Sequence, residues 1–227
     1  MFKRFQRGLG PGARGGDAAA GELGSLFEAR ATIAGRIRVE DLLSAAAAAS
    51  GEACLKATGM LDPEKHGYPP GTPVFSDAAN SILSRDSVDW AGAEGSVFFR
   101  IRAGALDRGY PPDAFPDVAD VYRVLVAGIG SVGWGWVPLS VSEDHRPRVE
   151  PLRDAYELRR PVGAVFEARG VRPADRPGVL ADAIVIELGR VIAAIDARIA
   201  IRLVLETMNG MAKTAPMTDV AMRGATP

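Results

Sequence analysis

The glycines Gly128, Gly130 and Gly133 have the spacing that most directly suggests chemistry. They form G-x-G-x-x-G behind an apolar run, which is the fingerprint of a dinucleotide-binding loop. Such a loop needs a strand before the glycines and a helix that begins among them. Here Pro138 falls where that helix would run, and the residues before the glycines have helical spacing. This context argues against a dinucleotide site, so we expect no bound cofactor. If a cofactor does bind, Gly128, Gly130 and Gly133 are the candidate residues.

Few side chains in the sequence are suited to acid–base catalysis. The chain contains two histidines, His66 and His145, and both lie in loops flanked by prolines. Asp144 and Arg146 beside His145 make this the most polar cluster of the sequence. Asp144, His145 and His66 are the candidate catalytic residues, because an imidazole or a carboxylate can transfer a proton in a reaction. A zinc site built from protein side chains would need further carboxylates, and we expect no metal site.

Four aromatic residues are candidates for contacts with a partner. Trp134 and Trp136 flank a glycine, so an extended chain would place both rings on one side. Tryptophan is enriched at binding surfaces, although the pair could equally close the edge of the core. The tetrapeptide GYPP occurs twice, so that Tyr68 and Tyr110 each precede two prolines. Either tyrosine belongs to a polyproline-II segment presented to a partner, or its ring packs on the neighbouring proline.

The stretch from Asp175 to Met211 organises the predicted fold. Its apolar residues recur at steps of three and four, which predicts a long helix over 176–208. Further apolar residues lie off this stripe, so the helix is buried on more than one side. It is either the central helix of the core or a helix that also packs on a partner chain, through Ile195 and Ile199. Residues 199–206 also alternate with a period of two, which would suit a strand.

The remaining elements follow from helix formers and breakers. Alanine-rich residues 38–58 predict a helix that ends at Gly59, and the prolines of 60–75 predict a loop. We expect further helices over 76–83, 88–106, 116–129 and 149–169, the last of them broken near Pro161, and a short strand over Val137–Val141. The expected fold is mainly α: a helical domain around a long C-terminal helix, with a small β element. An α+β fold is the alternative.

Both ends of the chain have the composition of loose tails. We expect a disordered basic and glycine-rich tail over 1–24, a single helix-rich domain over 25–211 and a flexible tail over 212–227. Lys3, Arg4 and Arg7 could contact nucleic acid or a membrane surface, but they are too few to separate these targets. No apolar segment follows them, so we expect no secretory signal. The chain also has no run of about eighteen uncharged apolar residues, so we expect no membrane span.

Composition limits the classes of function. The chain has 227 residues, of which 47% are hydrophobic, so it can form a real core. Its net charge of −1 creates no general attraction for nucleic acid. The single cysteine, Cys54, excludes an internal disulfide, which is typical of a cytoplasmic protein. Cys54 itself is expected to pack as a small apolar side chain.

No set of residues that converges on one reaction stands out. The sequence therefore favours a non-enzymatic structural or adaptor protein that contacts other subunits, its own or different ones. It would act in a bacterial or phage assembly of the secretion, conjugation or virion type. The first alternative is an enzyme that binds a small ligand or a nucleotide through the loop Gly128–Trp136. The second is a nucleic-acid-binding protein that uses the arginine-rich tail.

Overall fold

The computed structural model describes residues 11–129 and 137–219 and confirms a mainly α-helical fold with a small β element. Two short strands, β1 (Thr32–Ile33) and β2 (Arg36–Ile37), pair antiparallel. Short 3₁₀ helices are η1 (Pro112–Ala114), η2 (Glu143–His145) and η3 (Pro173–Asp175). The α-helices are α1 (Pro11–Ala31), α2 (Val39–Ala57), α3 (Asp77–Ser84), α4 (Val97–Asp107), α5 (Val118–Gly128), α6 (Pro151–Ala168), α7 (Arg176–Val191) and α8 (Ala197–Met211).

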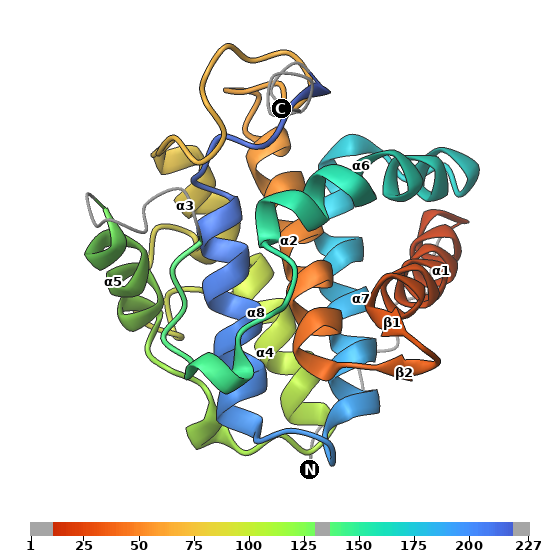
Figure 1. The fold of residues 1–227 in the computed structure, drawn as a ribbon, viewed down its shortest axis with the longest axis vertical. Coiled ribbons are helices and arrows are strands. Elements are labelled where there is room, and N and C mark those ends of the chain that lie inside the picture. The colour runs from red at the N-terminus through yellow and green to blue at the C-terminus, as the bar shows by residue number, and fades with distance from the viewer. Residues whose placement is uncertain (1–10, 130–136, 220–227) are drawn as a thin grey trace.

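Helix α2 is the centre of the fold, with α7 and α8 packed against it (Figure 1). Helices α1 and α6 cover one side of this layer, and α3 and α5 lie on the other. The small side chains of Ala45–Ala49 let the neighbouring helices approach closely. Gly51 marks a close approach of two backbones, because a Cβ atom there would lie 2.5 Å from the carbonyl oxygen of Met208 on α8. Cys54 is fully buried in this core, as predicted.

The long C-terminal helix is divided in two, which corrects the prediction of one helix over 176–208. Helix α7 ends at Val191 and α8 begins at Ala197. The side chain of Asp196 caps α8 by accepting hydrogen bonds from the backbone N–H groups of Arg198 and Ile199. The chain turns back at this point, and both helices contact α2. Residues 199–206 are helical, so the strand alternative is wrong there.

The predicted strand over Val137–Val141 is not formed; the small sheet is the hairpin of β1 and β2. Ala34 and Gly35 make its turn with positive φ angles of 51° and 75°, as two-residue hairpin turns require. Residues 137–141 instead run along α8. There the Glu206 carboxylate accepts hydrogen bonds from the backbone N and the hydroxyl of Ser140, both at 2.6 Å. Side-chain bonds from a helix thus replace the ladder bonds of a strand.

Two other helix predictions need correction. The helix predicted over 88–106 begins only at Val97, where the Ser96 hydroxyl caps it; residues 88–96 form turns. The helix predicted to break near Pro161 instead continues through it as α6. Leu158, Val162 and Val165 are buried on its inner face, so packing maintains the helix despite the missing proline N–H.

Both predicted tails are ordered where the structure describes them. Residues 11–24 belong to α1, whose side chains Ala19, Leu23 and Phe27 are fully buried, so the tail prediction for 1–24 is wrong from Pro11 onward. Residues 212–219, here called the C-terminal segment, are also packed, with Ala215 fully buried. Lys3, Arg4 and Arg7 lie outside the described residues. Within the described ranges, no helix has the length and apolar character needed to cross a bilayer.

Candidate functional site

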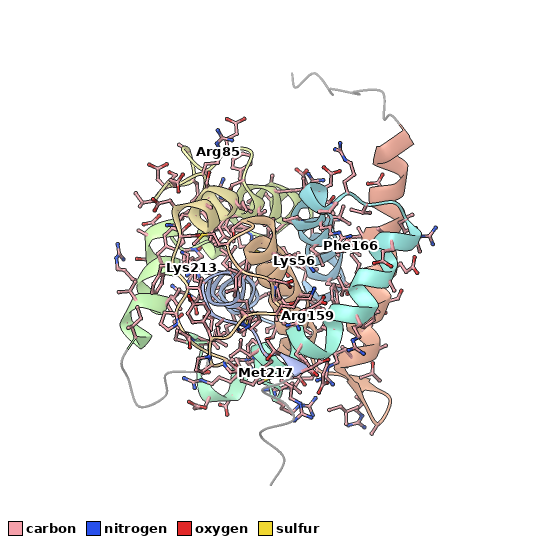
Figure 2. The ribbon with its side chains drawn as sticks, turned by 90° about the horizontal axis from the view of Figure 1, so that it is seen from above. Lys56, Arg85, Arg159, Phe166, Lys213 and Met217 are labelled. Carbon is pink, nitrogen blue, oxygen red and sulfur yellow. The ribbon has the colours of Figure 1, made fainter. Side chains whose placement is uncertain are left out.

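A cavity of about 370 Å³ opens between α2 and α6, and we call it the α2–α6 cavity. Its apolar surface comes mostly from small side chains on α2 and from α6. Figure 2 shows Lys56, Arg159 and Phe166 around this part of the molecule. The cavity is lined by Ala49, Glu52, Ala53, Lys56, Ala57, Glu64, Ala155, Arg159, Arg160, Val162, Gly163, Ala164, Phe166, Glu167, Pro173 and Arg176.

A buried ion pair forms part of the cavity wall. Arg159 on α6 donates two hydrogen bonds to the Glu52 carboxylate on α2, from Nε at 2.6 Å and from Nη2 at 2.8 Å. The exposed fractions of these side chains are only 11% and 8%. Burial raises the pKa of Glu52, while the hydrogen bond and charge of Arg159 act in the opposite direction. This two-point geometry fixes the positions of both groups.

The other cations of the cavity differ in their partners. Lys56 pairs with Glu64 at 3.7 Å, and Arg160 pairs with Asp219 at 3.2 Å. The Arg176 guanidinium stacks on the ring of Phe166, with its Cζ atom 5.1 Å from the ring centre. Its Nε is buried and meets no hydrogen-bond acceptor among the described residues. Arg176 is thus a cation held in place by an aromatic ring but not neutralised.

The C-terminal segment is tied to Arg159 and Arg160, two arginines that line the cavity. The Met217 carbonyl accepts a hydrogen bond from Arg159 at 2.9 Å, and Asp219 accepts one from Tyr156 at 2.8 Å. On its other side the segment pairs with the loop after α2, where Ala215 exchanges backbone bonds with Gly71 and Thr72. The position of Arg159 therefore depends on both α2 and the C-terminal segment.

No family model, curated protein or solved structure matches this chain. Its function must therefore be inferred from the chemistry of the side chains that the fold brings together. An apolar floor with a few fixed polar groups is the usual composition of a site for a small molecule. Among the described residues, no group of three or more histidine, cysteine or acidic side chains could hold a metal ion.

None of the predicted catalytic residues lines the cavity, and His66 lies apart from the adjacent Asp144 and His145. The His145 Nδ1 lies 2.9 Å from Glu40 Oε1, so this histidine does meet a carboxylate, at the start of α2. Asp144 is exposed and contributes its backbone carbonyl, which accepts a hydrogen bond from Arg38. His66 is half-buried, and its Nε2 lies 2.8 Å from the Pro216 carbonyl oxygen. The structure does not bring the three together.

The predicted interaction residues are also dispersed. Tyr68 is 55% exposed, whereas Tyr110 is buried and donates a hydrogen bond to the Leu188 carbonyl. Ile195 and Ile199 are half-buried around the start of α8.

The predicted cofactor loop is described only in part. Gly128 ends α5, so the chain before it is a helix and not the strand that a dinucleotide loop requires. A Cβ atom on Gly128 would lie 2.9 Å from Pro138 Cγ, which accounts for glycine at this position by packing alone. Gly130, Gly133, Trp134 and Trp136 lie outside the described residues.

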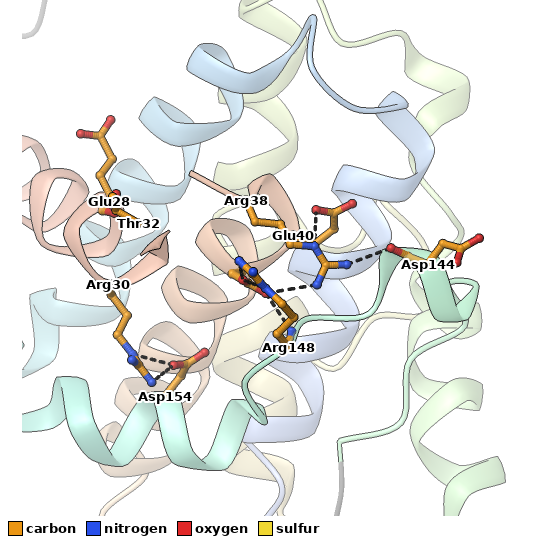
Figure 3. Close-up of polar contacts among 9 residues, drawn as sticks. Glu28, Arg30, Thr32, Arg38, Glu40, Asp144, Arg148 and Asp154 are labelled. Atoms are coloured by element: carbon orange, nitrogen blue, oxygen red, sulfur yellow. Dashed lines mark hydrogen bonds and ion pairs between the residues drawn. The ribbon is translucent and has the colours of Figure 1, made fainter. Parts of the chain in front are cut away.

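A second group of charges joins α1, α2 and α6 (Figure 3). Arg30 on α1 contacts Asp154 on α6, with both Nε and Nη2 2.9 Å from Oδ1. Arg148 donates to Asp41 from its backbone N and its Nε, both at 2.8 Å. Asp41 and Asp154 are almost completely buried, and burial raises the pKa of Asp154 to about 6. The first pair joins the end of α1 to α6, and the second joins the segment before α6 to the start of α2.

Glu150, at the start of α6, makes stability depend on pH. Burial raises the pKa of this carboxyl to about 7 from the ordinary 4.5. The folded chain then binds more protons than the unfolded chain between these values, so stability should increase as pH falls from 7 towards 4.5. We expect Glu150→Gln to flatten this dependence in urea titrations across the window. Glu143→Gln, which removes an exposed carboxylate nearby, should not; equal slopes in both variants would contradict the assignment.

Lys213 is the most deeply buried cation outside the cavity. Its Nζ donates to Asn209 Oδ1 at 2.7 Å and lies 3.7 Å from the centre of the Tyr122 ring. Burial lowers the pKa of Lys213 to about 7. Asn209 in turn donates to the Val121 carbonyl, and Tyr122 bonds to Ser84. The α2–α6 cavity does not include Lys213, which instead joins α5, α8 and the C-terminal segment.

The sequence reasoning missed the residues that line the cavity. Glu52 had a signal, since it is a carboxylate on the face of α2 that otherwise carries alanines. Arg159 had none, because the pattern of α6 is that of an amphipathic helix with arginines towards solvent. Arg176 is at the first position of α7, where a charged residue is ordinary. Only the packing of α6 and α7 on α2 brings the three together.

Proposed function

We propose that this chain binds a small organic molecule in the α2–α6 cavity. The observation that carries the proposal is the Glu52–Arg159 pair buried in the cavity wall. Apolar residues at the two positions would often serve stability as well or better. Fixed polar groups beside an apolar floor are, by contrast, what a ligand site requires.

The glycine at 163 also supports the proposal. Gly163 lies within α6 and lines the cavity, and an ideal Cβ atom on it has no atom within 4 Å. Glycine costs about 1 kcal/mol relative to alanine inside a helix. Here no close approach of another chain segment accounts for this cost. Glycine at this position leaves the cavity open.

The assembly role expected from the sequence stays a prediction. It rested on a helix with apolar residues on more than one side and on the two tryptophans. The buried residues of α7 and α8 pack within the chain itself, on α2 and α4 among others. Trp134 and Trp136 lie outside the described residues. Ligand binding is the function for which the described geometry offers the more specific support.

The test is to fill the cavity without disturbing the fold. We expect Gly163→Leu to abolish binding of fragments that bind the wild-type chain in a saturation-transfer NMR screen. The matched control is Gly21→Leu in α1, where a Cβ atom also has no neighbour within 4 Å and which does not line the cavity. Both variants should be more stable than wild type by about 0.5–1 kcal/mol, because leucine favours helix over glycine.

Fragment binding that survives Gly163→Leu would place the ligand elsewhere. A screen in which no fragment binds the wild-type chain would overturn the proposal altogether. Loss of binding in both leucine variants would show that the effect does not come from the cavity.

A further inference from the structure

We propose, on the basis of ligand binding in the α2–α6 cavity, that the ligand carries an anionic group, a carboxylate or a phosphate, and that Arg176 binds it. Arg176 stands at the start of α7, beside η3, on the rim formed with Pro173. Arg176 has no ion pair among the described residues, and its guanidinium lies over the ring of Phe166.

Most charges of the cavity neutralise one another. Arg159 pairs with Glu52, and Lys56 pairs with Glu64. Arg160 pairs with Asp219 of the C-terminal segment. Two charged residues of the lining then remain without an ion pair among the described residues, Arg176 and Glu167. Glu167 is exposed and therefore well solvated, whereas Arg176 is half-buried.

The contact with Phe166 leaves the terminal Nη groups of Arg176 available as hydrogen-bond donors, whereas its Nε is buried. A guanidinium that lies on an aromatic ring uses one face for the contact, while its N–H groups point outwards in its own plane. A carboxylate or phosphate can accept two of these N–H groups side by side. The buried Nε has no acceptor, although a buried donor without a partner is costly. An anion in the cavity would instead accept hydrogen bonds from the terminal Nη groups and offset the charge of the guanidinium.

The apolar residues that line the cavity predict that the rest of the ligand is apolar. Helix α2 lines the cavity partly with Ala49, Ala53 and Ala57, which offer no hydrogen-bonding side chain. A short aliphatic or similarly slender group would fit against them, and the volume of about 370 Å³ lies in the range of sites for small molecules. The ligand is thus a small amphiphile with an apolar body and an anionic end.

The test compares four probes that share one hexyl-type chain and differ in their end group: hexanoate, hexyl phosphate, hexanamide and hexylammonium. Dissociation constants are measured by titration NMR at neutral pH with full-length protein. We expect at least one of the two anions to bind the wild-type chain roughly tenfold more tightly than hexanamide, as a charge-assisted hydrogen bond implies. The stronger of the two anions distinguishes a carboxylate ligand from a phosphate ligand.

Two arginine variants locate the effect. Arg176→Gln should remove the preference for anions. Arg102→Gln is the matched control, because the Arg102 guanidinium also stacks on aromatic rings, those of Trp90 and Phe115, its Nε also lacks an acceptor, and it does not line the cavity. This control should keep the preference, so a general effect of losing a stacked arginine would be recognised.

The outcomes separate this inference from the proposed function. If hexanamide or hexylammonium binds as tightly as the anions and Gly163→Leu still abolishes that binding, the cavity is a ligand site and the inference about charge is wrong. An anion preference that survives Arg176→Gln also overturns it. If none of the four probes binds at millimolar concentration while fragments of other chemistry do, the anionic amphiphile is excluded as the ligand class.

Discussion

The variant Arg159→Met is expected to lower the free energy of unfolding by about 3–5 kcal/mol at neutral pH. Glu52 would lose both hydrogen bonds from the guanidinium and remain as a carboxylate whose side chain is 8% exposed. Breaking a buried pair costs this much because one charge is left without its partner. The Met217 carbonyl would also lose its hydrogen bond from Arg159, which loosens the C-terminal segment.

The loss in Arg159→Met should depend on pH in a defined direction. Burial already raises the pKa of Glu52, and removal of Arg159 takes away the hydrogen bond and the charge that most oppose this effect. The folded chain then takes up a proton on Glu52 more readily than the unfolded chain. The stability deficit should therefore shrink as pH falls towards the ordinary carboxyl value of 4.5. Urea unfolding followed by far-UV circular dichroism at several pH values measures both the deficit and its slope.

Two controls make the result interpretable. Arg153→Met removes an exposed arginine of the same helix that pairs with Glu157, and it should leave the free energy of unfolding almost unchanged. The double variant Glu52→Leu with Arg159→Met removes both charges and should be more stable than Arg159→Met alone. A cost for Arg159→Met as small as that for Arg153→Met would show that the pair is effectively solvated.

For Gly51→Ala we expect a loss of about 2–3 kcal/mol, although alanine is the better helix former. The new methyl group would lie 2.5 Å from the Met208 carbonyl oxygen and 2.6 Å from Met211 Cβ. The first of these atoms belongs to the backbone of α8, so the clash cannot be relieved by turning a side chain. Helix α8 would have to move away from α2, and the packing of their buried faces would loosen.

The comparison for Gly51→Ala is the same substitution at Gly163. There an ideal Cβ atom has no neighbour within 4 Å, so Gly163→Ala should gain about 0.5–1 kcal/mol from helix propensity. Opposite signs for two glycine-to-alanine changes in helices would demonstrate that the distance between α2 and α8 sets the outcome. A neutral or stabilising Gly51→Ala would mean that the two helices can separate at little cost. Thermal and urea unfolding provide the measurement.

Both expectations concern α2, which carries two different roles on different faces. One face, at Gly51, approaches α8 at backbone distance and requires the smallest side chain. Another face, at Glu52, Ala53 and Lys56, lines the cavity with α6. The proposed ligand site therefore lies on the central helix of the fold, which is the arrangement that keeps polar groups in fixed positions.

The sequence by itself determined the fold class and most of the helices. Periodic apolar residues and helix formers predicted the helices at 39–57, 77–84 and 118–128 to within two residues of their observed ends. These signals are local, since a helix bonds within its own segment. For the same reason the helical spacing before Gly128 predicted a helix there, which argues against the strand that a dinucleotide loop requires.

The tertiary structure alone decided the division of 176–208 and the order of both ends of the chain. The apolar residues of α7 and α8 have the same helical spacing. The sequence pattern therefore looks the same for one straight helix as for two helices that meet at a capping residue such as Asp196. The glycine-rich start of α1 looked too weak to fold alone. It is helical because Ala19 and Leu23 are buried against other helices, and packing of this kind supplies most of the stability of a helix.

The sequence marked Glu52 as a carboxylate on an alanine-rich helix face, but it did not reveal the candidate site as a whole. Glu52 and Arg159 are 107 residues apart, and each belongs to a helix that is unexceptional by itself. His145 and Asp144 were conspicuous because polar residues cluster there, yet they serve to attach a loop to α2. Which charges end up beside a cavity depends on how the helices pack across long sequence distances. Local patterns record which face of a helix is buried, but not which other face meets it.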